Sequence, residues 1–169
     1  VGKTGQHFRR ALEKYGISLD RDCWATNSLA CRPPSNRSPD DKEIGYCRPN
    51  VVAAIRELQP ERIILLGGPA MKSILGWTWK PDLGGPLVER WVGWRIPDQK
   101  TNAWICPTYH PSHCCRQLEE RDTVTQLFFE EHLRAAFETE GRPFPNGVPD
   151  HRKQVMVCLD DRGAAGLIR

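Results

Sequence analysis

Two polar side chains that can bind a small planar ligand stand at the ends of two apolar runs. Asn27 follows Cys23–Thr26, and His110 comes shortly after Ala103–Cys106. An amide both donates and accepts hydrogen bonds, and a neutral imidazole can donate one. Open α/β sheets bind ligands at the carboxyl ends of their strands, so two such strands would bring an amide and an imidazole to one edge. Taken alone, Asn27 could equally cap a turn, and His110 before proline could be an ordinary turn residue.

The segment after Asn27 is a stiff, cationic loop. Its prolines hold the backbone extended and exclude a regular hydrogen-bonded ladder. Together with its arginines and a cysteine, the loop residues of interest are Cys31, Arg32, Pro33, Pro34, Arg37 and Pro39. Cys47 lies 16 residues after Cys31, with a helix start between them. A strand end that leads into such a loop is a usual place for a ligand.

These motifs resemble those of the family 4 (iron–sulfur) uracil-DNA glycosylases. The shared pattern runs T-N-x-x-x-C-R-P-P-x-N-R-x-P, then a second cysteine at the same spacing, a Gly/Ala helix start and Y-H-P-S, and it covers roughly residues 1–137. The resemblance implies the fold of that superfamily, a three-layer α/β/α domain with a central, mostly parallel four-stranded sheet. It also implies that this sequence lacks the family's first strand, a Gly-Glu-x-Pro-Gly loop, a Cys-x-x-Cys pair and a phenylalanine before Val1.

The resemblance assigns Asn27 to uracil recognition and His110 to catalysis. An amide carbonyl accepts from uracil N3–H while its N–H₂ donates to O4, and cytosine presents the reverse polarity at both atoms. A donor at uracil O2 stabilises the negative charge that develops on the departing base. By the same resemblance Cys31 and Cys47 are two of the four ligands of a 4Fe–4S cluster.

Further residues are expected to bind DNA. By resemblance and by their position in loops and helix starts, the candidates are Arg37, Gly67, Gly68, Ser112 and Arg116. Two glycines between a strand and a helix can hold a phosphate, although tight-turn chemistry explains them equally well. Cys114 and Cys115 stand where the family usually has leucines, one of which fills the gap left by the flipped base. Arg90-Trp91 stands where the family usually has an Arg-Gly pair.

Apolar periodicity and turn residues indicate the elements that must position these side chains. We expect helices over Thr4–Tyr15, 39–59, Pro69–Leu75 and Arg121–Glu138, and strands over Cys23–Thr26, Arg62–Leu66, Ala103–Cys106 and Val155–Leu159. In the second helix, Ser38 is the expected N-cap, Pro39 the first helical residue and Pro49 an interruption. In the last helix, the apolar residues are Val124, Leu127, Phe128, Leu133 and Phe137. Between Trp77 and Asn102 no element can be predicted, and its four tryptophans are expected to pack in the core.

The composition is that of a single domain of ordinary size with a short extension. We assign residues 1–140 to an incomplete uracil-DNA glycosylase-like domain, 141–154 to a linker, and 155–169 to an appended strand or the start of a second domain. The 169 residues carry a net charge of +3, which permits a nucleic-acid partner without requiring one. No run is long and apolar enough to span a membrane, and no signal peptide opens the chain. We therefore expect a monomer in the cytoplasm.

Seven cysteines make an odd number, which does not suit a disulfide framework. Apart from the two assigned to the cluster, we expect the cysteines to be small buried hydrophobic residues; these are Cys23, Cys106, Cys114, Cys115 and Cys158. A mixed Cys/His zinc site lacks the expected Cys-x-x-Cys spacing.

Three functions remain open at this stage. The first is a DNA repair glycosylase that flips uracil out of DNA, hydrolyses its N-glycosidic bond and leaves an abasic site. The second is a catalytically inactive DNA-binding domain of the same superfamily, fused to a replication or repair protein. The third is a metal-stabilised structural module. If the first holds, residues 1–169 alone should excise uracil poorly and tend to aggregate, since a strand and two cluster ligands would be missing.

Overall fold

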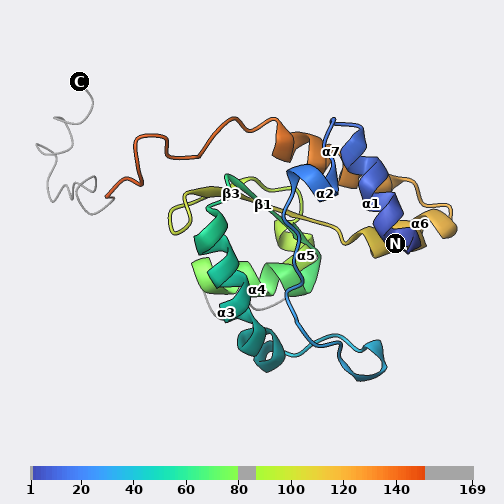
Figure 1. Cartoon of the computed structure of the whole chain (residues 1–169). Coiled ribbons are helices and arrows are strands. Elements are labelled where there is room, and N and C mark those ends of the chain that lie inside the picture. Colours follow the sequence, from blue (N-terminus) through green and yellow to red (C-terminus); the bar gives the residue numbers. More distant parts are fainter. Residues whose placement is uncertain (1, 80–86, 151–169) are drawn as a thin grey trace, which may run out of the picture.

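A computed structural model describes residues 2–79 and 87–150 and shows a small sheet with helices on both faces (Figure 1). The strands β1 (Arg62–Leu66) and β3 (Ala103–Thr108) pair in parallel, with Ile63 opposite Ile105. The short strand β2 (Ile96–Asp98) pairs with β3 antiparallel, which gives the order β1-β3-β2. The α/β class is thus confirmed, but the described residues form a three-stranded sheet and not the expected four-stranded one.

Seven α-helices and one 3₁₀ turn are present in the described part of the chain. They are α1 (Lys3–Glu13), α2 (Leu19–Asp22), the 3₁₀ turn η1 (Pro34–Asn36), α3 (Asp41–Leu58), α4 (Gly68–Thr78), α5 (Leu87–Trp91), α6 (Pro111–Glu119) and α7 (Val124–Phe137). The expected helix near the N-terminus is confirmed as α1, and Gly16, with φ of +71°, follows its end.

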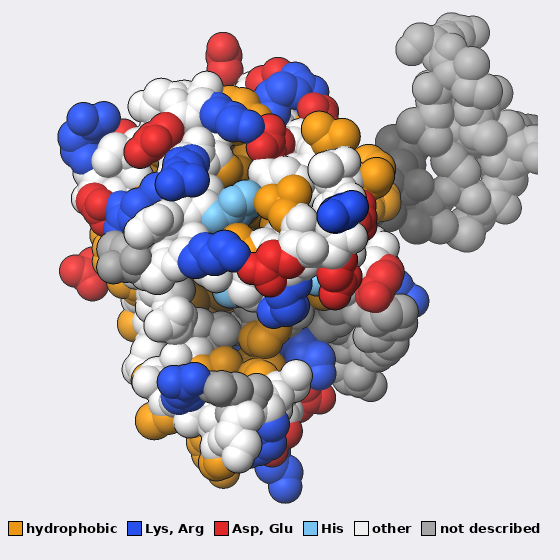
Figure 2. Space-filling model, turned by 90° about the vertical axis from the view of Figure 1, so that its right-hand side faces the viewer, with side chains coloured by type: hydrophobic (Ala, Val, Ile, Leu, Met, Phe, Trp, Pro, Cys, Tyr) orange, Lys and Arg blue, Asp and Glu red, His pale blue; other side chains and the backbone are white. Residues whose placement is uncertain are grey.

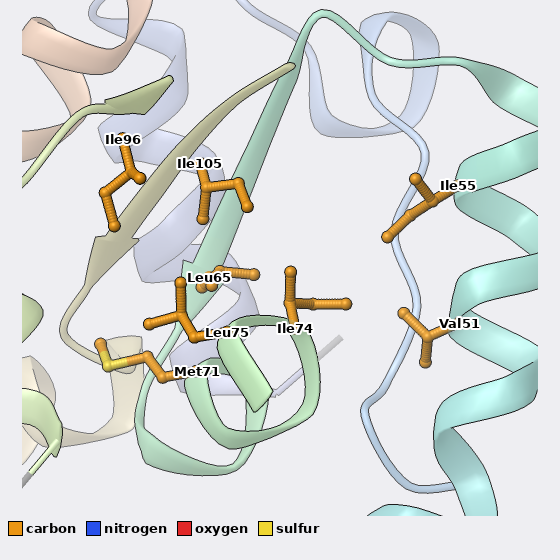
Figure 3. Packing of buried hydrophobic residues seen from close by; sticks show 8 residues of the cluster. All are labelled: Val51, Ile55, Leu65, Met71, Ile74, Leu75, Ile96 and Ile105. Carbon is orange, nitrogen blue, oxygen red and sulfur yellow. The ribbon is translucent and has the colours of Figure 1, made fainter. Parts of the chain in front are cut away.

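One core lies between the sheet and the helices α3 and α4. Figure 3 shows Leu65 and Ile105 on the strands facing Ile74 and Leu75 on α4. The cluster consists of Val51, Ile55, Leu65, Met71, Ile74, Leu75, Ile96 and Ile105. Burying one such side chain stabilises the fold by about 1.5–3 kcal/mol.

A second core lies on the opposite face, under α1, α6 and α7. Its fully buried members are Ala11, Leu12, Cys114, Phe129 and Leu133. Ile64 and Leu66 of β1 pack against this second cluster, whereas Ile63 and Leu65 belong to the first. This alternation along β1 is the period of two that a strand covered on both faces requires, and it confirms the three layers.

The predicted strand Cys23–Thr26 is wrong in the described structure. Residues 23–27 lie outside the helices and strands, and Trp24 is 56% exposed. A strand is stable only when its backbone groups pair with a neighbour, and the strand nearest in sequence, β1, pairs only with β3 among the described residues. An apolar run alone does not supply that partner.

Helix α3 differs from the prediction at its start and in its middle. Asp40 caps it in place of Ser38, since the Asp40 side chain accepts from the Glu43 amide at 2.8 Å and Glu43 accepts from the Asp40 amide at 2.9 Å. This reciprocal pair satisfies two backbone donors, which one serine hydroxyl cannot do. Pro49 lies inside the continuous helix and does not interrupt it. The buried residues Ile44, Val51, Val52 and Ile55 lie on both sides of Pro49 and hold the helix together across it.

The predicted apolar face of the last helix is partly wrong. Leu133 is buried, but Val124, Leu127 and Phe128 are 56%, 65% and 52% exposed, and Phe129 is fully buried instead. Adjacent phenylalanines on a helix point about 100° apart, so only one of them can face the second core.

The tryptophans between Trp77 and Asn102 are divided between core and surface. Trp77 and Trp91 pack against the first core, while Trp79 and Trp94 are 53% and 60% exposed. Trp91 makes edge-to-face contacts with both exposed rings, at centroid distances of 4.8 Å and 6.1 Å. The packing prediction therefore holds for two of the four.

Residues directly after α7 contact the domain. Asn102 exchanges two hydrogen bonds with the backbone of Phe144, both at 3.1 Å, and Arg142 donates to the Gln59 carbonyl at 2.6 Å. The predicted strand Val155–Leu159, with Cys158, lies outside the described residues. No helix in the described ranges 2–79 and 87–150 has the length and hydropathy to cross a membrane.

Candidate active site and nucleic-acid interface

The carboxyl ends of β1 and β3 form one corner of the molecule. The Gly67 amide donates to the Thr108 carbonyl at 3.0 Å, so the two strand ends are held side by side. Gly67 has φ of +82° and ψ of 177°, a region that only glycine adopts readily. A Cβ atom at this position would lie 3.0 Å from the Cβ of His110. The backbone of β1 therefore approaches His110 closely because residue 67 has no side chain.

His110 caps α6 with its own ring. Its Nδ1 accepts the Ser112 amide at 3.1 Å and lies 2.7 Å from the Ser112 hydroxyl oxygen. Partial burial, together with the positive charge of Arg116, lowers the pKa of His110. A neutral ring whose Nδ1 accepts carries its proton on Nε2. The corner therefore offers one N–H donor on a neutral imidazole.

Two helices, α4 and α6, begin at this corner. Helix N-termini attract anions, and the predicted DNA-contact residues Gly67, Gly68 and Ser112 lie at these two helix starts. The Gly67 amide, however, is occupied by Thr108, and Pro69 in the first turn of α4 has no amide hydrogen. Among the other candidates, Ser112 is half-buried and bonded to His110, while Arg116 is exposed on α6.

The segment that carries Asn27 runs from α2 past the sheet and into the loop at the lower right of Figure 1. The face in Figure 2 is hollowed between a larger upper part and a smaller lower part. Asn27 is exposed. Arg37 binds Glu43 through two hydrogen bonds of 2.9 Å and 2.6 Å, and this pairing lowers the pKa of Glu43 to about 2. A phosphate at Arg37 would therefore compete with a carboxylate.

The loop brings Cys31 towards Cys47. The amide of Ala30 lies 3.5 Å from the Cys47 sulfur and donates to it. Cys31 is exposed and Cys47 half-buried, so both thiols are accessible to a metal. Within residues 2–79 and 87–150, however, no group of three or more possible ligands gathers at one place. The described residues thus fit half of a four-thiolate site, with an N–H group that supports one sulfur.

The remaining cysteines follow the prediction in part. Cys106 and Cys114 are buried, and burial raises the pKa of each thiol to about 11. Thiols in this state are poor ligands and poor nucleophiles. Cys23 and Cys115 are only half-buried.

A group of residues behind the corner was not predicted. His132 of α7 contacts Thr108, Tyr109 and the backbone of Gly93. Nothing in the sequence around His132 indicates that its side chain contacts Thr108, which lies 24 residues earlier.

Comparison with known proteins gives the family. A sequence model of the uracil DNA glycosylase superfamily matches residues 1–137. The chain belongs to this superfamily. It is 32% identical over 127 residues to a type-4 uracil-DNA glycosylase of Pyrobaculum aerophilum, covering 69% of this chain and 59% of that protein. It is also 32% identical over 114 residues to the enzyme of the same name from Saccharolobus solfataricus, covering 66% and 51%. This superfamily member thus spans about half the length of the curated relatives that it matches.

A match of another kind is to a DNA polymerase of Bacillus phage SP01. The identity is 27% over 122 residues, which is 72% of this chain but only 12% of the polymerase. A superfamily domain of this type is thus similar to a small part of a replication protein.

Proposed function

We propose that this superfamily member acts in a DNA repair glycosylase that hydrolyses uracil from DNA and leaves an abasic site. The observation that carries the proposal is His110, a neutral imidazole at the end of β3 with its Nδ1 held by Ser112 and its Nε2–H available. The type-4 uracil-DNA glycosylase relatives support the same reaction.

In the proposed reaction the uracil is first flipped out of the nucleic-acid stack. Asn27 reads its N3–H and O4 with a carbonyl and an amide. The C1′–N1 bond breaks with its electron pair moving to the base, and the His110 Nε2–H donates to O2, where charge develops. Water supplies the hydroxyl group at C1′ and, in the end, a proton to the base. Donors of this kind contribute about 3–4 kcal/mol to transition-state stabilisation in other enzymes.

The water-positioning group is not assigned to any described residue. Asp40 and Asp41 would be the first carboxylates to test if this chain were active alone. Both already have partners, Asp40 with the Glu43 amide and Asp41 with Lys72 at 2.6 Å.

The proposed partner is uracil-containing DNA. Arg37, Gly68, Ser112 and Arg116 are the contacts to phosphate that we propose, with Gly67 shaping the turn. The mild positive charge of +3 and the mixture of basic and acidic side chains in Figure 2 agree with limited phosphate contact. We further propose a monomer that works in the cytoplasm.

The proposed cofactor is a 4Fe–4S cluster for which Cys31 and Cys47 supply two thiolates. The Ala30 N–H, which points at the Cys47 sulfur, supports this role. When bound, such a cluster would tie the loop after Asn27 to helix α3. Two further ligands would have to come from outside the described residues.

The second candidate is a DNA-binding superfamily domain without glycosylase activity. The observation in its favour is the match to a small part of a phage DNA polymerase. An assay of the whole protein with single-stranded uracil-containing DNA would distinguish the two candidates. Excision of uracil would support the glycosylase. Binding without excision would support the second candidate, and neither binding nor excision would support a structural module.

The sharpest test of base reading is a pair of variants at Asn27. Since this side chain is exposed, Asn27→Ala should fold normally and lose excision, which we would measure as single-turnover uracil release alongside thermal unfolding. Asn27→Asp should shift preference towards cytosine, because a second acceptor can take its amino group. Asn50→Ala, the same change at an exposed site of α3 outside the proposed machinery, is the matched control. Full uracil release by both Asn27 variants would contradict the assignment.

A further inference from the structure

The imidazole of His132 reaches the end of strand β3 from helix α7. Its Nδ1 lies 3.1 Å from the Thr108 hydroxyl oxygen. Thr108 is 2% exposed, and it precedes His110 by two residues. A buried hydroxyl is stable only when it has a hydrogen-bond partner, and His132 supplies one here.

The same imidazole packs against the residue next to His110. The Tyr109 ring lies 5.8 Å from the His132 ring and 5.7 Å from the His113 ring, measured between centroids. Tyr109 therefore lies between one imidazole from α7 and another from α6. Phe128 stacks on His132 at 6.2 Å with an interplanar angle of 17°.

The edge of the His132 ring contacts the backbone at Gly93. A Cβ atom at residue 93 would lie 2.7 Å from the ring Nε2, so only glycine fits, and its φ of +84° also favours glycine. The Gly93 amide donates to the Pro107 carbonyl at 2.9 Å. His132 thus touches two segments that are themselves bonded, the turn at Gly93 and the end of β3.

Burial lowers the pKa of His132, against the opposing effect of Glu131 on the same helix. Nε2 has no hydrogen-bond partner in the part of the chain that the structure describes. A neutral ring fits this surrounding, since a second N–H would face the Gly93 backbone without an acceptor.

His110 stands between the end of β3 and the start of α6. Its ring is held at the α6 side by its hydrogen bonds to Ser112, so its orientation also depends on how the end of β3 is fixed. The backbone before it is fixed on one side by Gly67, through the Thr108 carbonyl, and on the other by His132, through the Thr108 hydroxyl. We propose that His132 is a positioning residue that sets the orientation of His110 towards uracil O2. This inference rests on the proposed glycosylase function.

The first test is kinetic and uses the whole protein with single-stranded uracil DNA. His132→Ala should lower the single-turnover rate at saturating DNA by about 10- to 100-fold, as expected for a displacement of the order of 1 Å. DNA affinity should change less than about threefold. His132→Asn keeps a donor at the position of Nδ1 and should restore most of the rate. Glu131→Gln, on the same helix but away from Thr108, is the matched control.

A double-variant cycle tests whether Thr108 carries the effect. Thr108→Val removes the hydroxyl at constant shape, so it should slow excision as His132→Ala does. The two changes together should cost little more than either alone, because they remove one interaction. If the costs multiply instead, His132 acts by another route and the proposal is overturned. Should His132→Ala fail to fold, the His132→Asn and Thr108→Val variants still decide the matter.

The second test does not need activity. In NMR spectra of histidine-labelled protein, His132→Ala should shift and broaden the His110 ring signals, His132→Asn should largely restore them, and Glu131→Gln should leave them unchanged. Unchanged His110 signals in His132→Ala would overturn the positioning role. If the unaltered protein releases no uracil but the His110 signals respond as expected, the glycosylase proposal fails while the structural coupling stands.

Discussion

The two halves of the candidate site are built in different ways. The corner around Gly67, Thr108 and His110 joins two strands and two helices; Gly67 and Thr108 are buried and bonded to each other, and His110 is exposed beside them. The loop from Asn27 to Arg37 is irregular apart from the turn η1 and mostly exposed, with the Ala30–Cys47 contact and the Arg37–Glu43 pair among its links to helix α3.

This difference indicates which half of the site is rigid without a ligand. The geometry of the corner is fixed by packing, so substitutions there should affect folding and chemistry together. The loop has little packing, so its changes should affect ligand binding while folding stays nearly unchanged. A cluster on Cys31 and Cys47 would give the loop the rigidity that packing gives the corner.

The largest effect is expected at the corner. Gly67→Ala places a residue in a glycine-only backbone region, which costs roughly 1–3 kcal/mol, and its Cβ would lie 3.0 Å from the Cβ of His110. We expect a clear drop in the denaturant midpoint and loss of uracil release.

Gly45→Ala is the matched control for that experiment. Gly45 lies in α3, and a methyl group added there would meet nothing within 4 Å beyond the neighbouring backbone of its own helix, so alanine should stabilise the helix by about 0.5–1 kcal/mol. If Gly67→Ala were as stable as the unaltered protein, the corner would not be the rigid half of the site.

An intermediate effect is expected from the thiols of the loop. In anaerobically prepared whole protein, Cys31→Ser or Cys47→Ser should abolish the brown colour and bound iron and lower the thermal midpoint, because metal-binding energy adds to folding energy. In residues 1–169 without metal, the same changes should leave the unfolding midpoint nearly unaltered, since Cys31 is exposed and Cys47 half-buried. Colourless protein with stoichiometric zinc would favour the structural module instead.

The smallest effect is expected at the surface pair of the loop. The Arg37 guanidinium and the Asp40 amide lower the pKa of Glu43 from 4.5 to about 2. The carboxylate therefore contributes stability above pH 4.5, and this contribution is lost as the pH falls towards 2. Glu43→Gln should flatten that part of a curve of thermal midpoint against pH, with Glu57→Gln as control. An unchanged curve would mean that the pair does not hold the loop in solution.

Much of the sheet and its helices could be predicted from local pattern. The run Arg62–Leu66 is apolar on both faces and precedes two glycines, a pattern that favours a strand covered on both sides. The structure has this strand as β1. The strand β2 and the face of α7 could not be predicted in this way. Ile96–Asp98 is only three residues long, and the choice between Phe128 and Phe129 depends on where α1 and β3 lie.

The site divides along the same line. His110 and its place at a strand end follow from sequence, and so does the glycine turn beside it. The contribution of His132 does not, because it depends on tertiary packing between α7 and β3. The segment before Asn27 failed for the same reason in the opposite direction. Its residues favour a strand, but no neighbouring strand in the described structure pairs with them.

The parallel pairing of β1 with β3 also has a consequence for how the chain folds. Arg62 pairs with Trp104, so the ladder closes a loop of about 40 residues. At synthesis rates of about 5–20 residues per second, β1 leaves the ribosome roughly 2–8 s before its partner. During that interval α4, which follows β1 directly, can already cover Leu65 with Met71, Ile74 and Leu75. The second face of β1, with Ile64 and Leu66, packs in a cluster that also needs α6 and α7, so α1 alone can cover only part of it until those helices are made. That partly covered face is the surface that a chaperone would recognise on the nascent chain.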